Sequence, residues 1–394
     1  MPDSRDLSIN RLVLNFPGFE TTTPVHQLER LLAGGEKTAK LWGYDFSPAE
    51  ISDKRGEYKA EIQCRSSGEN WVADTRYVHF SWDDIIGKYE NMPYPKSFFR
   101  HLPAYLSFFF DGSVIKYFKA SKRYWGFTIY PLLLMVLFAV ISFGLAFFAL
   151  GQVSIILSIL SGFIGFLILC KWPGDQFYVN LSVNDWAFAR DMCRRSNPEI
   201  EKRYEEFSNH VIHELENSNV DEVLIVGHSF GSVWAVAALA YALEQKPDLF
   251  SGKRVTFLAL GSSFLKISLV KEARHFSEFL ETVLSKPELL WHEIQTKTDF
   301  ISFYKSDPFK PLGIVEFAAE LVVHRVNFKK ALSKVRHKKM MRSMYLAHRQ
   351  YILYCDKRVH HDFQLRCFGP LFAKDLAINP GIIDTSRHLN QADG

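Results

Sequence analysis

The sequence lacks several patterns that identify other classes of protein. Only five of its 394 residues are cysteine, at positions 64, 170, 193, 355 and 367, and no two of them form a CxxC pair. This set predicts reduced thiols rather than a disulfide framework or a zinc site. The chain has no GxxxxGK phosphate-binding loop, and no GxGxxG motif follows an expected strand. We therefore expect neither a metal ion nor another cofactor.

The chain also has no large excess of charge and no secretory signal. Its net charge of +4 at pH 7 gives no reason to expect a nucleic-acid partner. Met1 to Asp6 contain no basic stretch that leads into an apolar core, so no signal peptide is predicted.

Charge is missing altogether from Tyr124 to Cys170. One helix of this length would be about twice too long for a bilayer, whose hydrocarbon core needs about 20 apolar residues. Two helices fit, with Trp125–Leu150 as the first span, a turn at Gly151-Gln152, and Val153–Cys170 as the second. The sequence thus predicts a transmembrane hairpin and a lipid bilayer as a partner.

Basic residues flank this hairpin on both sides. They are Lys116, Lys119, Lys122 and Arg123 before it, and Lys171, Arg190, Arg194 and Arg195 after it. Positive residues close to membrane spans stay in the cytoplasm. A hairpin returns the chain to the side where it started, so we expect an integral membrane protein whose soluble domain and both termini are cytoplasmic.

The segment from Pro93 to Arg123 mixes aromatic residues such as Phe98, Tyr105 and Phe118 with lysine and arginine. It fits a segment that lies at the membrane surface. It fits an amphipathic core helix equally well, because its periodicity is imperfect.

Outside the hairpin, strands and helices alternate. The expected strands are Arg11–Phe16, Tyr58–Cys64, Arg76–Trp82, Val223–Val226, Lys253–Ser262 and Ile294–Tyr304. A helix is predicted with Thr23 as its N-cap, Pro24 as its first residue and Gly34-Gly35 as its end. Val183–Leu215 predicts a helix pair broken near Asn197-Pro198. This alternation predicts an α/β fold with a mostly parallel, doubly wound sheet.

The most informative stretch is Gly227-His228-Ser229-Phe230-Gly231, which has the form GxSxG. It follows four β-prone apolar residues and leads into a helix rich in alanine. A strand, a sharp turn and a helix in this order present a serine hydroxyl for nucleophilic attack. Ser229 is therefore the candidate catalytic nucleophile.

A serine hydroxyl needs a base that takes its proton and an acid that orients the base. Both are expected after Ser229, with the acid just past the end of a strand. Asp307 fits, because it follows the expected Ile294–Tyr304 strand, whereas Asp299 lies within that strand and is the alternative. Six histidines follow Asp307 and are candidates for the base: His324, His337, His348, His360, His361 and His388.

Backbone N–H groups are needed to bind the oxyanion of the tetrahedral intermediate. One candidate is the amide of Phe230, directly after the nucleophile. The other is expected from the loop after the Arg11–Phe16 strand, where Pro17 has no N–H and Phe19 is the candidate donor.

These blocks resemble the serine esterase and lipase-like branch of the α/β-hydrolase superfamily. The resemblance covers residues 8–370 in separated blocks. It rests on Asn15-Phe16-Pro17-Gly18-Phe19 as the oxyanion loop, Gly227–Gly231 as the nucleophile elbow, Ser306-Asp307-Pro308 as the acid turn, and His348 with Tyr351 as the histidine loop.

The resemblance implies a triad of Ser229, Asp307 and His348, with His360-His361-Asp362 as the second choice for the base. It implies a hydrolase domain made of residues 1–123 and 173–394, interrupted by a transmembrane hairpin at 124–172. The chain departs from the family pattern in that hairpin and in having Pro-Gly where many members have His-Gly.

The sequence therefore predicts a membrane-anchored serine hydrolase that cleaves carboxylic esters, with lipid or acyl esters favoured by the nearby bilayer. Two alternatives stay open. One is a non-catalytic scaffold or lipid-binding protein with this fold. The other is an acyltransferase that uses the same triad.

Overall fold

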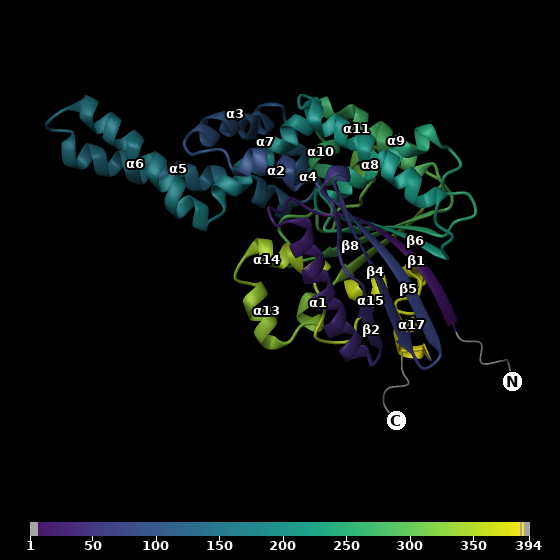
Figure 1. Cartoon of the computed structure of the whole chain (residues 1–394). Helices are drawn as coiled ribbons and strands as arrows, with labels where there is room; N and C mark the ends of the chain where they lie inside the picture. The colour runs from purple at the N-terminus through teal and green to yellow at the C-terminus, as the bar shows by residue number, and fades with distance from the viewer. Residues whose placement is uncertain (1–6, 387, 390–394) are drawn as a thin grey trace.

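A computed structural model describes residues 7–386, 388 and 389. The prediction that Met1 to Asp6 contain no signal peptide concerns residues outside this described range. Figure 1 shows a body built around a twisted sheet, from which two long helices project to one side.

In the described part of the chain, nine strands form one sheet in the order β2-β4-β5-β1-β6-β7-β8-β9, with β3 beside β4. Neighbouring strands from β5 to β9 in this order are parallel, whereas β4 is antiparallel to β2, β3 and β5. The expected α/β class is confirmed, with a mixed sheet that is mostly parallel. The strands are β1 (Leu7–Phe16), β2 (Asp45–Pro48), β3 (Ser52–Lys54), β4 (Lys59–Gly68), β5 (Trp71–Phe80), β6 (Glu222–His228), β7 (Val255–Leu260), β8 (Leu289–Thr296) and β9 (Glu320–Val326).

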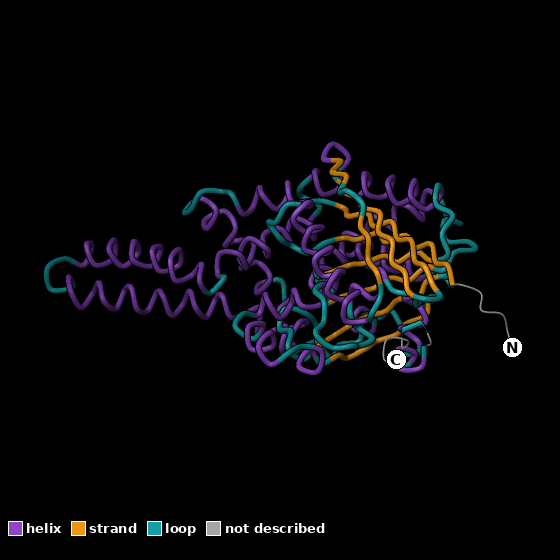
Figure 2. Tube along the Cα trace, turned by 60° about the horizontal axis from the view of Figure 1, so that its bottom comes forward, coloured by secondary structure: helices purple, strands orange, loops and turns teal. Residues whose placement is uncertain are grey.

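Helices cover both faces of the sheet (Figure 2). The helices are α1 (Pro24–Trp42), α2 (Asp83–Glu90), α3 (Lys96–Phe110), α4 (Ser113–Ala120), α5 (Lys122–Leu150), α6 (Ile155–Gln176), α7 (Val179–Arg194), α8 (Pro198–Glu216), α9 (Gly231–Gln245), α10 (Phe264–Ser268), α11 (Arg274–Leu284), α12 (Phe328–Ala331), α13 (Lys334–Met340), α14 (Met344–Arg349), α15 (Phe363–Phe368), α16 (Ala373–Ile378) and α17 (Ile382–Thr385). The helix pair expected over Val183–Leu215 is present as α7 and α8.

The central strands are apolar on both sides because each side faces a different core. On β6, Leu224 and Val226 join a cluster with Leu28 and Leu31 of α1. Ile225, which lies between them, joins the larger cluster that contains α8, α9 and α11. Successive side chains of a strand point to opposite faces, so a continuous apolar run is what a strand covered on both faces requires.

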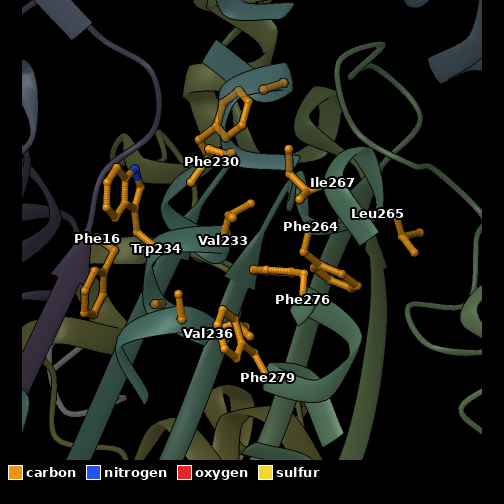
Figure 3. Close-up of a cluster of buried hydrophobic side chains, with 14 of the residues drawn as sticks. Phe16, Phe230, Val233, Trp234, Val236, Phe264, Leu265, Ile267, Phe276 and Phe279 are labelled. Carbon is orange, nitrogen blue, oxygen red and sulfur yellow. The ribbon is translucent and has the colours of Figure 1, made fainter. Parts of the chain in front are cut away.

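Helix α9, which follows Ser229, is buried along most of its length. Figure 3 shows Phe230, Val233 and Trp234 beside aromatic and aliphatic side chains of β1, α10 and α11. The Trp234 ring lies 5.3 Å from that of Trp82 and 5.6 Å from that of Phe207. This packing fixes the helix that begins at the elbow.

Helices α5 and α6 form the projecting hairpin, with the turn at Gly151 as predicted (Figures 1 and 2). Both are long and apolar enough to cross a membrane. Ser142 of α5 donates a hydrogen bond to the Gly162 carbonyl of α6 at 2.5 Å. A Cβ at Gly162 would lie 2.5 Å from the Phe143 ring, so the absent side chain lets the two helices approach closely.

Two expected boundaries are corrected by the structure. Helix α1 continues through Gly34-Gly35 to Trp42, because these glycines are packed tightly under Gln364 and Phe46 rather than placed at a turn. Strand β8 starts at Leu289 and ends at Thr296, and does not run from Ile294 to Tyr304. This second correction moves Asp299 from the interior of a strand to the loop just after it.

The segment from Pro93 to Arg123 forms amphipathic helices that pack on the core, the second of the two expectations. Phe98, Tyr105 and Tyr117 of α3 and α4 are buried in the core. Phe110 and Ile115 remain largely exposed. The segment is therefore a pair of amphipathic helices with an outward apolar surface near the hairpin.

Candidate active site

Ser229 lies at the turn between β6 and α9 with a backbone φ of 55°. This left-handed conformation is strained for a residue with a side chain, and such strain is concentrated at functional sites. A Cβ at Gly227 would lie 2.6 Å from the Ser232 Cα, and a Cβ at Gly231 would collide with the Phe16 carbonyl. The two glycines of the motif are thus required by close backbone packing around the serine.

The serine side chain is 7 % exposed, and its nearest polar partner is another hydroxyl. Ser229 Oγ lies 3.3 Å from Ser263 Oγ, in the loop after β7. The Ser263 N–H donates to the Ser229 carbonyl at 3.2 Å, and so joins the two loops. The sequence contained Gly-Ser-Ser at this strand end, but nothing marked Ser263 as the neighbour of the nucleophile.

His348 lies on α14 and is held from two sides. Its Nδ1 lies 2.8 Å from Asp299 Oδ2. Its carbonyl accepts a hydrogen bond at 3.1 Å from Nε2 of His228, whose ring centre is 4.8 Å from that of His348. His228 directly precedes Ser229, so the covalent neighbour of the candidate nucleophile holds the candidate base. Sequence reasoning missed this role of His228.

The protonation states of these groups follow from their surroundings. Burial lowers the pKa of His228 to about 3, so this imidazole is neutral and its Nε2–H serves as the donor to His348. Burial alone would raise the pKa of Asp299, but its pairing with His348 and the hydrogen bonds from Ser302 and the Ile301 N–H lower it overall. Asp299 is therefore a carboxylate that orients His348 through Nδ1–H.

The other nitrogen of His348, Nε2, is buried and has no hydrogen-bond partner within residues 7–386. With Nδ1–H donated to Asp299, this Nε2 carries the free lone pair that a general base requires. The hydrogen bonds of the described residues include none from Ser229 to His348. Catalytic hydrogen bonds are often incomplete without substrate.

The expected pairing of Asp307 with His348 is corrected to Asp299. Asp307 is exposed, and its Oδ1 accepts hydrogen bonds from the Phe309 N–H at 2.9 Å and the Lys310 N–H at 2.8 Å. It thus caps a short turn. The physical reason for the correction is the early end of β8, which brings Asp299 to the edge where Ser229 and Ser263 lie.

His360-His361-Asp362 also has a structural role. Asp362 is fully buried and caps α15 by accepting hydrogen bonds from the N–H groups of Gln364 and Leu365. It also accepts from the Cys355 N–H at 2.9 Å. In the part of the chain that the structure describes, no hydrogen bond joins this group to Ser229.

The two residues that carry the candidate oxyanion donors have neighbouring side chains. The rings of Phe19 and Phe230 are 6.3 Å apart, and a Cβ at Gly18 would be 3.0 Å from the Ser229 Cβ. The loop after β1 therefore lies against the elbow. Neither the Phe19 N–H nor the Phe230 N–H donates to another backbone group of the described residues outside the regular elements.

A buried ion pair underlies this site. Lys266 of α10 binds Asp185 of α7, and its ammonium lies 4.7 Å from the centre of the Phe230 ring. Burial lowers the pKa of Lys266 and raises that of Asp185, and the pairing opposes both shifts. The charge of His348 also acts on Asp185. No motif or spacing in the sequence marks these two residues as a pair.

Among residues 7–386, 388 and 389, no three histidine, cysteine or acidic side chains lie close enough together to hold a metal ion. Comparison with known proteins found no matching family model, no matching curated protein and no matching solved structure.

Proposed function

We propose that the chain is a serine hydrolase of the α/β-hydrolase type that cleaves carboxylic esters, anchored in a membrane by the hairpin. The observation that carries this proposal is the His348–Asp299 pair, which leaves His348 Nε2 without a hydrogen-bond partner among the described residues. The same histidine is held by His228, the residue before a serine in a strained turn between strand and helix. A buried imidazole nitrogen without a partner and a strained backbone at the serine do not stabilise the fold.

In this proposal the Ser229 hydroxyl turns from Ser263 to His348 when substrate binds. Its oxygen attacks the acyl carbon while His348 Nε2 takes the proton. The N–H groups of Phe230 and Phe19 bind the oxyanion that forms. The C–O bond to the alcohol then breaks, and His348 returns the proton to the leaving oxygen. A water molecule, activated by the same base, releases the acid from the acyl-enzyme.

The hairpin is proposed to cross the bilayer because its outward side chains are apolar along most of its length, including Leu133, Val140 and Phe148. Trp172, at the end of α6 where the hairpin returns to the body, is 75 % exposed, as is common for aromatic residues at a membrane interface. The soluble domain is proposed to be cytoplasmic, from the basic residues that flank the spans.

The test is labelling of the purified, detergent-solubilised protein with a fluorophosphonate probe. We expect labelling of the unchanged chain and none of Ser229→Ala. Ser263→Ala is the matched control, because it removes the neighbouring hydroxyl and is expected to keep the label. Labelling of Ser229→Ala, or loss of labelling only in Ser263→Ala, would contradict the assignment of the nucleophile.

Protein that has not been treated with the probe is then incubated with esters, with and without an alcohol acceptor. Release of free acid without the acceptor supports hydrolysis, and product formed only with the acceptor supports acyl transfer. A folded chain that neither reacts with the probe nor turns over esters would support the non-catalytic alternative.

A further inference from the structure

A cavity of about 420 Å³ lies at the base of the hairpin. Its walls come from three segments that are far apart in the sequence: Gly126, Phe127 and Tyr130 of α5, Thr298 and Phe300 of the loop after β8, and residues between Met341 and Ala347. Most of these side chains are apolar. Its size falls within the range of about 300–1,000 Å³ that is usual for small-molecule sites.

The cavity adjoins both members of the acid–base pair. Thr298 and Phe300 are the two neighbours of Asp299, and Ala347 directly precedes His348. The loop that holds the carboxylate and the helix that holds the imidazole therefore form two walls of the cavity. A ligand in it would contact the chain neighbours of Asp299 and His348.

The third wall belongs to the helix that continues into the hairpin. Tyr130 of α5 forms a hydrogen bond of 2.7 Å with Ser182 of α7, and Ser182 forms one of 3.0 Å with Tyr345 of α14. These bonds fasten the base of the hairpin to the histidine helix. In Figure 1, α14 and α13 lie below the point where α5 leaves the body.

The rim of the cavity exposes apolar surface where the hairpin leaves the body. Phe300 is 45 % exposed and Met341 is 50 % exposed. Isolated exposed apolar residues are common. Phe300 and Met341, however, border an apolar cavity, and the exposed side chains of the neighbouring helix α5 are also mostly apolar.

The surface next to this rim is basic. Between Glu320 and Asp356 the sequence has nine lysine and arginine residues and no acidic residue. Lys338, Lys339 and Arg342, which flank Met341 on and just after α13, are exposed. Basic residues at this level favour the negatively charged surface of a bilayer.

We infer that this cavity is the acyl-chain site, and that the enzyme takes its substrate sideways from the bilayer. The ligand is the hydrocarbon chain of a lipid ester, which enters past Phe300 and Met341 and places its carbonyl near Ser229. The inference rests on the proposed function, because it assigns that function a membrane lipid as substrate.

The test fills the cavity by changing one glycine. A Cβ at Gly126 would meet no atom within 4 Å, so Gly126→Phe can extend into the cavity without strain. Gly144→Phe is the matched control, because Gly144 lies on the same helix, is equally open and is remote from the cavity. Both changes replace a helical glycine with a residue of better helix propensity.

We expect Gly126→Phe to lower kcat/KM for a palmitoyl ester by about tenfold or more, since excluding even single methylenes from an apolar pocket changes this ratio about that much. Its kcat/KM for an acetyl ester and its fluorophosphonate labelling should stay within about twofold of the unchanged chain, well inside that effect. Gly144→Phe should behave as the unchanged chain with both esters. Equal loss with both esters, or no loss with either, would overturn the inference.

A second measurement separates this inference from the proposed function. A palmitic acid that carries a photoreactive group should crosslink to peptides containing Gly126–Tyr130 and Met341–Ala347, and Gly126→Phe should abolish these adducts. Adducts without any fluorophosphonate labelling would defeat the proposed hydrolase and leave the lipid site standing. Labelling without adducts would defeat the lipid site alone.

Discussion

Asp299 and Asp307 are eight positions apart and have opposite surroundings. Asp299 is fully buried against His348, while Asp307 is exposed and caps a turn. A carboxylate that accepts a hydrogen bond from Nδ1–H of a histidine favours the tautomer in which Nε2 carries no proton. The proposed triad therefore depends on the first carboxylate and not on the second.

Asp299→Asn is expected to lower kcat for an ester substrate by about 10³–10⁴-fold, because an amide at this position favours the wrong histidine tautomer. Asp307→Asn is the control and should change kcat less than about twofold, a small effect on the same scale. Steady-state kinetics with an acetyl ester give both values. A large loss in Asp307→Asn with little loss in Asp299→Asn would restore the original assignment.

Glu293 of β8 is a second buried carboxyl at this edge of the sheet. Burial raises its pKa to about 7, although the hydrogen bonds from Ser262 and Trp291 act in the opposite direction. The folded chain therefore keeps a proton that the unfolded chain loses above about pH 4.5. The stability that Glu293 contributes is therefore fully present below about pH 4.5 and is lost as the pH rises to about 7.

Glu293→Gln is expected to remove up to about 3 kcal/mol of this pH dependence, since each pKa unit corresponds to about 1.4 kcal/mol. Melting curves followed by tryptophan fluorescence at pH 5, 6, 7 and 8 measure the slope. Glu281→Gln, on the exposed face of α11, is the control and should keep the slope of the unchanged chain. An identical slope in Glu293→Gln would disprove the role of this carboxyl.

At the scale of elements, helices α7 and α10 are joined by the ion pair of Asp185 and Lys266. The ammonium of Lys266 also lies 4.0 Å from the centre of the Trp186 ring. Removing one partner of a buried ion pair leaves an unpaired charge, which is more costly than the absence of both.

Lys266→Met is therefore expected to destabilise the fold by about 3–5 kcal/mol. The double change Lys266→Met with Asp185→Asn should cost less than Lys266→Met alone, because the buried carboxylate is gone as well. Guanidinium unfolding of the detergent-solubilised chain measures each free energy of unfolding. Additive losses in the double variant would show that the pair is not coupled.

Short sequence patterns predicted the features that depend on residues adjacent in the sequence. The N-cap Thr23, the elbow at Gly227–Gly231 and the hairpin turn were all identifiable from short runs of sequence. The end of β8 was not identifiable, because Ile301, Phe303 and Tyr304 have high strand propensity but no strand partners. Strand propensity depends on its context in a sheet, so pairing decided where this strand stops.

The same limit explains the errors in the site. Asp299 and His348 are 49 positions apart, and the role of His228 depends on a backbone contact across 120 positions. No periodicity along the chain encodes such contacts. The turn at Ser229 was predictable because its close backbone packing requires glycines next to it in the sequence, whereas residues that are neighbours only in space leave no such local pattern.

At the scale of the whole molecule, the hairpin and the site are parts of one arrangement. Helix α5 contributes a wall to the cavity beside Asp299 and then continues away from the body. If the hairpin crosses the bilayer, its turn lies on the far side and every soluble element lies on the near side. The positive flanking residues predict that the near side is the cytoplasm.

This topology predicts opposite labelling of two single-cysteine positions. Gln152 is exposed at the hairpin turn, and Ser251 is exposed between α9 and β7. All five native cysteines are buried, so background labelling should be low.

In intact cells, a maleimide that does not cross the membrane should label Gln152→Cys and should label Ser251→Cys only after permeabilisation. Labelling of both variants from the same side would mean that α5 and α6 do not cross the bilayer, and labelling of Ser251→Cys alone would mean that the domain faces outward. Only the expected pattern is compatible with a site that takes its substrate from the cytoplasmic leaflet.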